Sequence, residues 1–303
     1  MDARRTVEAV WRMESPRLIA SLTRLVRDVG TAEEIAQDAF VLALEQWPRD
    51  GVPDNPGAWL TATAKHKAID RIRRERSQQS KYTQIAVDPS AQQPSAMPAP
   101  DAVEGVEDDL LALVFVACHP VLPRESRVAL TLRLVGGLRT DEIARAFLVP
   151  SATMGQRISR AKRTLSEAKV PFEVPSREEL PARLSAVLEV VYLVFNEGYA
   201  ATSGEDWIRR DLAAEAMRLA RVLAGLLPRE PEVHGLVALT ELQASRFAAR
   251  LGPGGEPILL QDQDRSRWEA ARTLEDAAAT APTRRERNLL MARAAAASAR
   301  TES

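Results

Sequence analysis

The stretch at residues 78–105, QQSKYTQIAVDPSAQQPSAMPAPDAVEG, constrains the fold more than any other feature of the chain. It is rich in Gln, Ser, Pro and Ala and has few large apolar side chains, so it cannot bury a core of its own. We therefore expect a flexible linker between separately folded parts. The sequence predicts helical blocks at residues 5–77, 106–170 and 177–303.

The residue types in these blocks favour helices. Aromatic residues make up only 5% of the 303 residues, and Val, Ile, Tyr and Thr are sparse beside Ala, Leu, Arg and Glu. The latter group has high helix propensity, and the hydrophobic content of 45% is enough for each block to bury a core. The composition therefore predicts an all-α protein of two or three domains.

The sequence also suggests a compartment. The N-terminus, MDARRTVEAV, has no apolar signal-peptide core, and no apolar run is long enough to cross a bilayer. The single cysteine, Cys118, cannot form an internal disulfide and fits a reducing cytosol, where we expect a packed thiol. We therefore expect a cytoplasmic protein with no membrane contact.

The first block contains two helices with different charge. Gly30 and Thr31 open the first, in which Thr31 can act as the N-cap and Glu34 as its capping-box partner. An apolar stripe follows as far as Trp47. The turn-forming residues 48–57 predict a loop. A basic helix then begins near Trp59, which we expect to face the core.

The second block predicts a helix–turn–helix. Thr140 caps a short helix, residues 148–150 form the turn, and Ser151 caps the next helix. In that helix helical spacing places four residues inward: Met154, Ile158, Ala161 and Leu165. The same spacing places five on the exposed face: Gly155, Gln156, Ser159, Arg160 and Arg163.

Basic residues are clustered in a chain whose formal net charge is only −1. The clusters are KHKAIDRIRRER at 65–76 and RISRAKR at 157–163. They suggest defined contacts with an anionic partner, although ordinary solvated helix faces can look the same. On the second cluster's helix, Gln156 can pair with adenine and Arg160 with guanine. The alternative is a helical hairpin with a basic outer face.

The order of these elements resembles the sigma-70 family, in particular its extracytoplasmic-function group. AEEIAQDAFVLALEQW is similar to sigma region 2.2, NPGAWLTATAKHKAIDRIRRERS to regions 2.3 and 2.4, and TDEIARAFLVPSATMGQRISRAKRTL to region 4.2. The resemblance covers residues 5–170. It implies a factor that binds core RNA polymerase, through the clamp coiled coil of the largest subunit and the flap, and directs it to −10 and −35 promoter elements.

The resemblance also implies roles for particular residues. The set expected to bind polymerase is Glu34, Gln37 and Asp38. The set expected at the −10 element is Val52, Asp54 and Asn55 in the loop that grips a flipped base, with Lys65, Lys67, Arg71 and Arg74 along the single strand. The set expected at the −35 element is Arg133, Ser151, Thr153, Gln156, Ser159, Arg160 and Arg163. Gly155 and Ser159 depart from the family's usual Arg and bulky residue, which leaves the −35 preference open.

Residues 177–303 extend beyond an ordinary member of the group. YLVFNEGYAATSG and QDQDRSRWE resemble the helical extension of one sigma subgroup, which commonly continues into tetratricopeptide-like repeats. Here only about one helical pair remains after Trp268, too little for a repeat array. Two apolar stripes predict a helical hairpin: Leu212, Ala216, Leu219, Leu223 and Leu226, then Val233, Leu236, Leu239, Ala244 and Phe247. We expect a regulatory extension with a cytosolic regulator as a possible partner, docked on the sigma domains or closed on its own core.

The sequence gives little support for catalysis, a cofactor or a metal. His66, His119 and His234 lie far apart, and GPGG at 252–255 lacks the Lys-Ser/Thr of a phosphate loop. Asp262 and Asp264 could suggest a cation site, but ion pairing or helix capping explains them better. Two other readings remain open: a stand-alone helix–turn–helix repressor with a ligand-binding domain, and an enzyme built on the third block.

Overall fold

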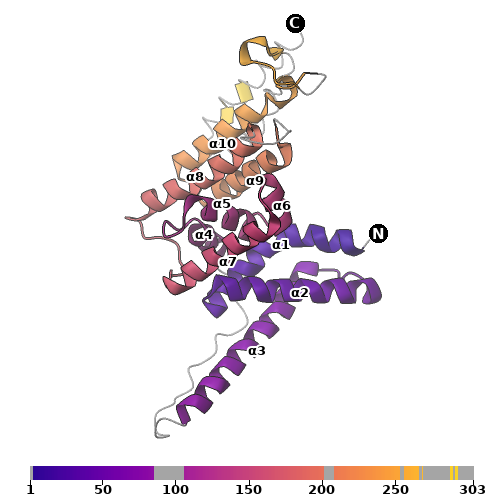
Figure 1. The fold of residues 1–303 in the computed structure, drawn as a ribbon, viewed down its shortest axis with the longest axis vertical. Helices are drawn as coiled ribbons and strands as arrows, with labels where there is room; N and C mark the ends of the chain where they lie inside the picture. Colours follow the sequence, from indigo (N-terminus) through magenta and orange to yellow (C-terminus); the bar gives the residue numbers. More distant parts are fainter. Residues whose placement is uncertain are drawn as a thin grey trace. The chain divides into compact units, whose positions relative to one another are not determined.

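A computed structural model describes residues 3–84, 106–200, 208–252, 256–265 and 268, with short helical pieces at 287–288 and 291–292. In these residues the regular secondary structure is helical, apart from an isolated bridge between Leu251 and Pro257. The all-α prediction is therefore confirmed. The chain divides into two compact units (Figure 1). Unit 1 comprises 1–122, 130–139 and 155–176, and unit 2 comprises 123–129, 140–154 and 177–303.

Unit 1 is built on the first helix. Helices α1 (Ala3–Val26), α2 (Val29–Asp50), α3 (Pro56–Gln84) and α4 (Val106–Ala117) form its main part, and α1 packs against the other three. Trp11 of α1 meets Phe40 of α2 edge to face, with ring centroids 4.3 Å apart. Because the apolar faces of four helices converge, the inward side chains of α1 and α2 are removed from water.

The N-terminus of α2 differs from the sequence prediction. The helix begins at Val29, and Asp28, not Thr31, is its N-cap, because the Asp28 side chain accepts a 2.7 Å hydrogen bond from the Thr31 N–H. Burial opposes ionisation of Asp28, but hydrogen bonds from Thr31 and Ser166 outweigh it and lower its pKa. The cap thus carries a negative charge at the positive end of the helix dipole.

The loop expected at residues 48–57 is shorter than predicted, because both flanking helices extend into it. Helix α2 continues through Pro48 to Asp50, and α3 already begins at Pro56. Proline is tolerated in the last turn of α2 because it removes only one backbone hydrogen bond there. Helix α3 also extends to Gln84, into the expected linker, whose residues 85–105 lie outside the described part of the chain.

The helix–turn–helix has the predicted elements. Helix α5 (Arg124–Leu134) is followed by α6 (Thr140–Ala146) and α7 (Ser151–Glu167), and Leu148 adopts a left-handed φ of 50° in the turn between the last two. The four residues predicted to point inward from α7 are all buried: Met154, Ile158, Ala161 and Leu165. The thiol of Cys118 is also buried, 3.2 Å from the Thr131 hydroxyl, as expected for a packed cysteine.

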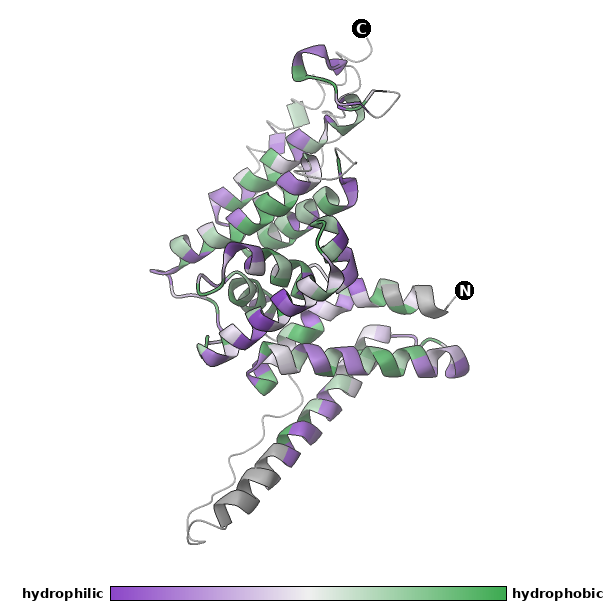
Figure 2. Ribbon diagram, in the orientation of Figure 1, coloured by the Kyte–Doolittle hydropathy of each residue, from purple (hydrophilic) through white to green (hydrophobic). Residues whose placement is uncertain are grey.

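The extension in unit 2 forms three packed helices. They are α8 (Leu180–Tyr199), α9 (Arg210–Leu226) and α10 (Pro231–Ala244), whose apolar sides meet one another (Figure 2). Helices α8 and α9 approach closely at Gly198, where an added Cβ would lie 2.8 Å from the Cα of Ala213. Only a residue without a side chain allows this approach.

The predicted stripe of α10 is partly wrong. Leu239 is 42% exposed, whereas Thr240 and Glu241 are buried beside Val233 and Leu236. Thr240 can be buried because its hydroxyl donates to the Leu236 and Val237 carbonyls of its own helix, and Glu241 because it pairs with Arg221 of α9. Short 3₁₀ turns follow at Phe247–Ala249 and Leu260–Asp262. The helical pair expected after Trp268 falls almost entirely outside the described residues.

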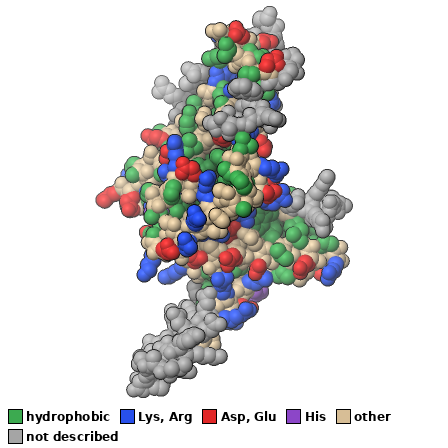
Figure 3. All heavy atoms as spheres, in the orientation of Figure 1, with side chains coloured by type: hydrophobic (Ala, Val, Ile, Leu, Met, Phe, Trp, Pro, Cys, Tyr) green, Lys and Arg blue, Asp and Glu red, His purple; other side chains and the backbone are tan. Residues whose placement is uncertain are grey.

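Two features are absent from the described residues. In that part of the chain, no helix combines the length and apolar character needed to cross a membrane. Nor do the described residues group three or more His, Cys, Asp or Glu side chains in a way that could hold a metal ion. Acidic and basic side chains are interspersed on the face shown in Figure 3, in keeping with the nearly neutral total charge.

Candidate nucleic-acid and polymerase interfaces

The three residues expected to bind polymerase lie on α2, and each has a polar partner within unit 1. The Gln37 amide donates to the Glu33 carboxylate at 2.7 Å. Glu34 lies 3.3 Å from Arg71, and Asp38 lies 3.6 Å from Lys67. The side chains of Glu34 and Asp38 are 64% and 67% exposed, so a partner can reach both.

The basic residues of α3 do not form one continuous track. Lys67, Arg71 and Arg74 are spaced at i, i+4 and i+7 and share one side of the helix, whereas Lys65 falls on the opposite side. Two of the three, Lys67 and Arg71, are those that pair with α2. The structure therefore brings the expected polymerase residues and part of the expected −10 set onto one surface of unit 1.

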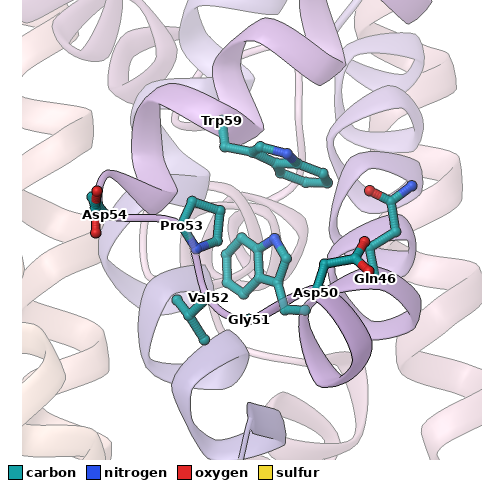
Figure 4. A pocket seen from close by; sticks show the side chains of 8 residues that line it. Gln46, Asp50, Gly51, Val52, Pro53, Asp54 and Trp59 are labelled. Atoms are coloured by element: carbon teal, nitrogen blue, oxygen red, sulfur yellow. The ribbon is translucent and has the colours of Figure 1, made fainter.

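A cavity of about 340 Å³ lies where α2 ends and α3 begins (Figure 4). Val52, Pro53 and Asp54 line it from the loop, and Trp47 and Trp59 from the helices. The two indoles meet edge to face, with centroids 5.6 Å apart, and the buried Trp47 Nε1 has no hydrogen-bond partner in the described residues. The cavity thus has an aromatic wall formed by the two indoles.

Two residues near this cavity have positions that the sequence did not indicate. Trp59, expected in the core, is only half-buried and lines the cavity. Asn55, expected to grip DNA, caps α3, because its Oδ1 accepts a 3.0 Å hydrogen bond from the Ala58 N–H. In Figure 4 the carboxylate of Asp54 lies on the far side of Pro53 from Trp59.

The outer face of α7 presents the residues expected to read the −35 element. The exposed side chains are Ser151, Thr153, Gln156, Ser159, Arg160 and Arg163. Arg163 lies 3.6 Å from Glu167 one turn further along, an exposed pair that contributes little to stability. Gln156 and Arg160 are one helical turn apart, as two side chains that read neighbouring bases must be.

Arg133 is the exception in the −35 set. Its side chain is only 12% exposed and lies 2.5 Å from the Glu33 carboxylate, which is 2% exposed. Lys162 of α7 approaches the other oxygen of Glu33 at 2.9 Å. Arg133 also lies over the ring of Trp11, 5.9 Å from its centroid. Together these residues form a buried ionic cluster, here called the Glu33 cluster.

The charge of Glu33 is maintained by its partners. Burial alone would raise its pKa, but Arg133 and Lys162 outweigh that effect and lower the pKa below its ordinary value. Sequence reasoning missed Glu33, because Arg133 and Lys162 are 100 and 129 residues away along the chain. The only sequence signal is an acidic residue within the otherwise apolar face of α2.

In unit 2 the YLVFNEGY segment of α8 contacts the end of α6. Glu197 pairs with Arg209 at 2.8 Å, and both side chains are nearly buried. Arg209 also donates to the Ala146 carbonyl in the last turn of α6, which has no partner within its own helix. Glu189, further up α8, pairs with Arg124 and Arg127 at the start of α5 at 3.0 and 3.4 Å.

The extension also contains aromatic side chains stacked with guanidinium groups. Tyr199 stacks on Phe195, and Arg250 lies 3.7 Å from the Tyr199 ring centroid. Burial, the largest effect on Arg250, lowers its pKa. Trp268, from the QDQDRSRW segment, lies within 5.6 Å of Arg246. These contacts all lie within the extension.

Two family models match the parts of the chain that carry these surfaces. Sigma-70 region 2 matches residues 10–78, and sigma-70 region 4 matches residues 113–165. The chain belongs to the sigma-70 family, in its extracytoplasmic-function group. A third model, a family of unknown function called DUF6596, matches residues 183–301, which include the extension.

Relatives of this sigma-family chain include both named and uncharacterized proteins. An uncharacterized protein of Rhizobium meliloti is 42% identical over 255 residues, covering 84% of this chain and 60% of the relative. The probable ECF RNA polymerase sigma factor SigI of Mycobacterium tuberculosis is 28% identical over 58% of this chain and 60% of its own length. The ECF RNA polymerase sigma factor SigK of Mycobacterium ulcerans is 29% identical over 49% of this chain and 78% of its own length.

The match to the first two of these relatives spans three fifths of their length. No solved structure matches the chain.

Proposed function

We propose that this sigma-70 family protein is an alternative sigma factor, which binds core RNA polymerase and directs it to promoters with −10 and −35 elements. The observation that carries the proposal is the pair of separate exposed surfaces. One is the acid–Gln–acid set of α2, and the other is the outer face of α7. Each lies within a segment that matches a sigma-70 region.

The polymerase contact is assigned to Glu34, Gln37 and Asp38. The present partners of Glu34 and Asp38 are the partly exposed side chains of Arg71 and Lys67, so a basic surface of the clamp coiled coil can replace them at low cost. The second polymerase contact, with the flap, is assigned to the region 4 helices on the family resemblance alone. This pattern of binding requires no covalent chemistry by the chain, and we place its action in the cytoplasm with polymerase.

The −10 contact is assigned to the cavity and to the basic side of α3. A base removed from the duplex needs a shaped pocket and a stacking partner, and the cavity beside Trp59 provides both. Lys67, Arg71 and Arg74 then follow the strand, with Val52 and Asp54 at the rim of the pocket. Lys65 and Asn55 are weaker members of the set, because the first faces away and the second caps α3.

The −35 contact is assigned to α7. Gln156 and Arg160 read base edges, Ser159 leaves room beside them, and Arg163 holds a phosphate. The N-terminal turn with Ser151 and Thr153 has the unpaired N–H groups that favour a phosphate. Arg133 belongs to this set only when it is released from Glu33.

The extension is assigned a regulatory role. The contact of Glu197 and Arg209 with the end of α6 supports it, because it joins the extension to the helix–turn–helix without a separate protein. A cytosolic ligand or protein that displaces this contact would be the regulator.

Copurification tests the proposal directly. The tagged full-length chain should retain the core polymerase subunits, and the reconstituted holoenzyme should start transcripts at defined sites that core enzyme alone ignores. A stand-alone repressor would bind duplex DNA without retaining polymerase. An enzyme would neither bind duplex DNA nor retain polymerase. Either of these two outcomes would refute the proposal.

A further inference from the structure

The Glu33 cluster joins two parts of unit 1 that have different expected partners. Glu33 precedes the polymerase-binding set on α2, whereas Arg133 and Lys162 belong to α5 and α7 of the region that matches sigma-70 region 4. The Trp11 indole supports the same junction, because its Nε1–H donates to the Gly137 carbonyl at 3.0 Å. The contact is therefore built from α1, α2, α5 and α7.

The charges in this junction depend on one another. Glu33 is almost fully buried, and its two oxygens face Arg133, Lys162 and the Gln37 amide. A buried carboxylate is tolerated only when it is paired, and removing one partner leaves an uncompensated charge. Without Glu33, two cations would face each other across the same site. The arrangement thus depends on a single acidic side chain.

The same arrangement restricts what Arg133 can do. If Arg133 contacts DNA, as the proposed function assigns, its guanidinium must leave Glu33 because it cannot hold both partners at once. Lys162 lies on the helix that carries Gln156 and Arg160, and its ammonium group is likewise engaged. A DNA phosphate offers these cations the same chemistry that Glu33 offers them within the chain.

We propose that Glu33 is an internal latch, which occupies Arg133 and Lys162 in the free chain and must be displaced before region 4 binds promoter DNA fully. This proposal rests on the proposed function for its DNA partner, but not for the latch itself. Gln37 extends the latch to the polymerase surface. A partner that takes the Gln37 amide withdraws one of the hydrogen bonds that stabilise the Glu33 carboxylate.

The latch can be measured as a distance. Spin labels at Arg49→Cys on α2 and Glu167→Cys on α7, both exposed positions of unit 1, report the separation of the two halves in a full-length Cys118→Ala background. The unchanged Glu33 should give one narrow distance distribution, whereas Glu33→Gln should give a broader distribution at longer distance. Glu45→Gln, an exposed change on the same helix, serves as the control.

Binding to a short random-sequence duplex tests the consequence. A latch that leaves only a fraction of molecules competent weakens apparent affinity by that fraction. Lys162→Gln breaks the same contact, so its distance distribution should broaden as well, but it also removes one of the released cations and should therefore bind DNA less tightly than Glu33→Gln does. Glu33→Gln should bind severalfold more tightly, and Glu45→Gln should bind like the unchanged chain.

Two results would overturn the latch. One is an unchanged distance distribution in a folded Glu33→Gln protein, checked by circular dichroism. The other is a Glu33→Gln protein that binds the duplex no more tightly than Glu45→Gln does. Failure of the proposed function would look different, because no variant would then retain core polymerase while the distances would still respond to Glu33→Gln.

Discussion

Glu34 lies 3.3 Å from Arg71, so a residue assigned to polymerase binding is paired with one assigned to the −10 strand. Both side chains are substantially exposed, at 64% and 42%, and such pairs contribute about 0–1 kcal/mol. Asp38 and Lys67 repeat the arrangement one turn further along α2. In the free chain, the acidic side chains of one expected binding surface are therefore weakly paired with basic side chains of the other. A partner that binds either surface more strongly can replace these pairs.

Asp38→Arg should weaken binding to core polymerase at least tenfold, because it reverses one of the two charges of the α2 set. The fold should be retained, since Asp38 is 67% exposed and surface changes usually alter the free energy of unfolding by less than about 0.5 kcal/mol. Pull-down of core subunits measures the effect. Glu45→Arg reverses an exposed charge elsewhere on α2 and should leave recovery unchanged. Equal recovery for both variants would remove Asp38 from the interface.

Arg160→Ala should cost about 1–3 kcal/mol of DNA-binding free energy at one −35 base pair and little once that base pair is already mutated. Arg74→Ala, which removes an exposed cation of α3, should weaken binding by a similar factor on every sequence. Footprinting both variants on single-base promoter mutants measures the difference. A uniform loss with Arg160→Ala would show that Arg160 contacts a phosphate.

The stability of unit 1 should fall in acid through Glu33. Its pKa in the folded chain lies below the ordinary value of 4.5, so the stabilisation is fully present above about pH 4.5 and is lost as pH falls through the folded pKa. Glu33→Gln should cost about 3–5 kcal/mol at neutral pH, because it leaves buried cations unpaired. The difference between the two proteins in urea denaturation should shrink as pH decreases. A difference independent of pH would contradict the ionic role.

Ionisation of Asp109 should have the opposite effect on stability from ionisation of Glu33. Burial, which is the largest effect, raises its pKa despite the nearby Arg24. Its ionised form is therefore less favourable in the folded chain, and that penalty appears as pH rises through the folded pKa. Asp109→Asn should consequently destabilise the chain less at neutral pH than Glu33→Gln does, as measured by the same denaturation series. A larger loss with Asp109→Asn would show that its pair with Arg24 outweighs burial.

Arg209→Ala should destabilise unit 2 by about 3–5 kcal/mol, because it leaves Glu197 without its buried partner and removes a donor to the Ala146 carbonyl. Arg218→Ala breaks a pair with Glu215 on α9 whose side chains are 42% and 16% exposed, and it should cost less, about 1 kcal/mol. Chemical denaturation compares the two. Promoter-directed transcription should also change in Arg209→Ala alone if the extension acts through α6.

Helical periodicity correctly predicted features that depend only on residues close together in the sequence. Every inward position assigned on α7 is buried, because an amphipathic helix of this length has only one apolar side to bury. The N-cap of α2 was misplaced by three residues, since Asp28 and Thr31 are both capping types and only the backbone shows which one accepts the hydrogen bond. On α10 hydrophobicity selected Leu239, whereas Thr240 and Glu241 are buried because of their own hydrogen bonds and ion pairs.

The candidate surfaces likewise divide into those that local sequence patterns predict and those that depend on residues far apart in the sequence. The exposed sets of α2 and α7 could be found from local patterns and family resemblance. The Glu33 cluster could not, because nothing near Glu33 in sequence indicates Arg133 or Lys162. The grouping of 140–154 with the extension in unit 2 was equally hidden, since it depends on contacts such as that of Arg209 with Ala146.

The close approach of α8 and α9 at Gly198 has a consequence for searching genomes. A chain with any other residue at this position would have to move α9 away from α8, because even a methyl group would overlap the Ala213 backbone. The glycine in YLVFNEGY is therefore required for the close packing of α8 against α9, independently of any function of the motif. Among proteins that carry sigma-70 regions, a glycine here followed by a small residue at the position of Ala213 should separate chains that can build this extension from chains that only resemble it in length.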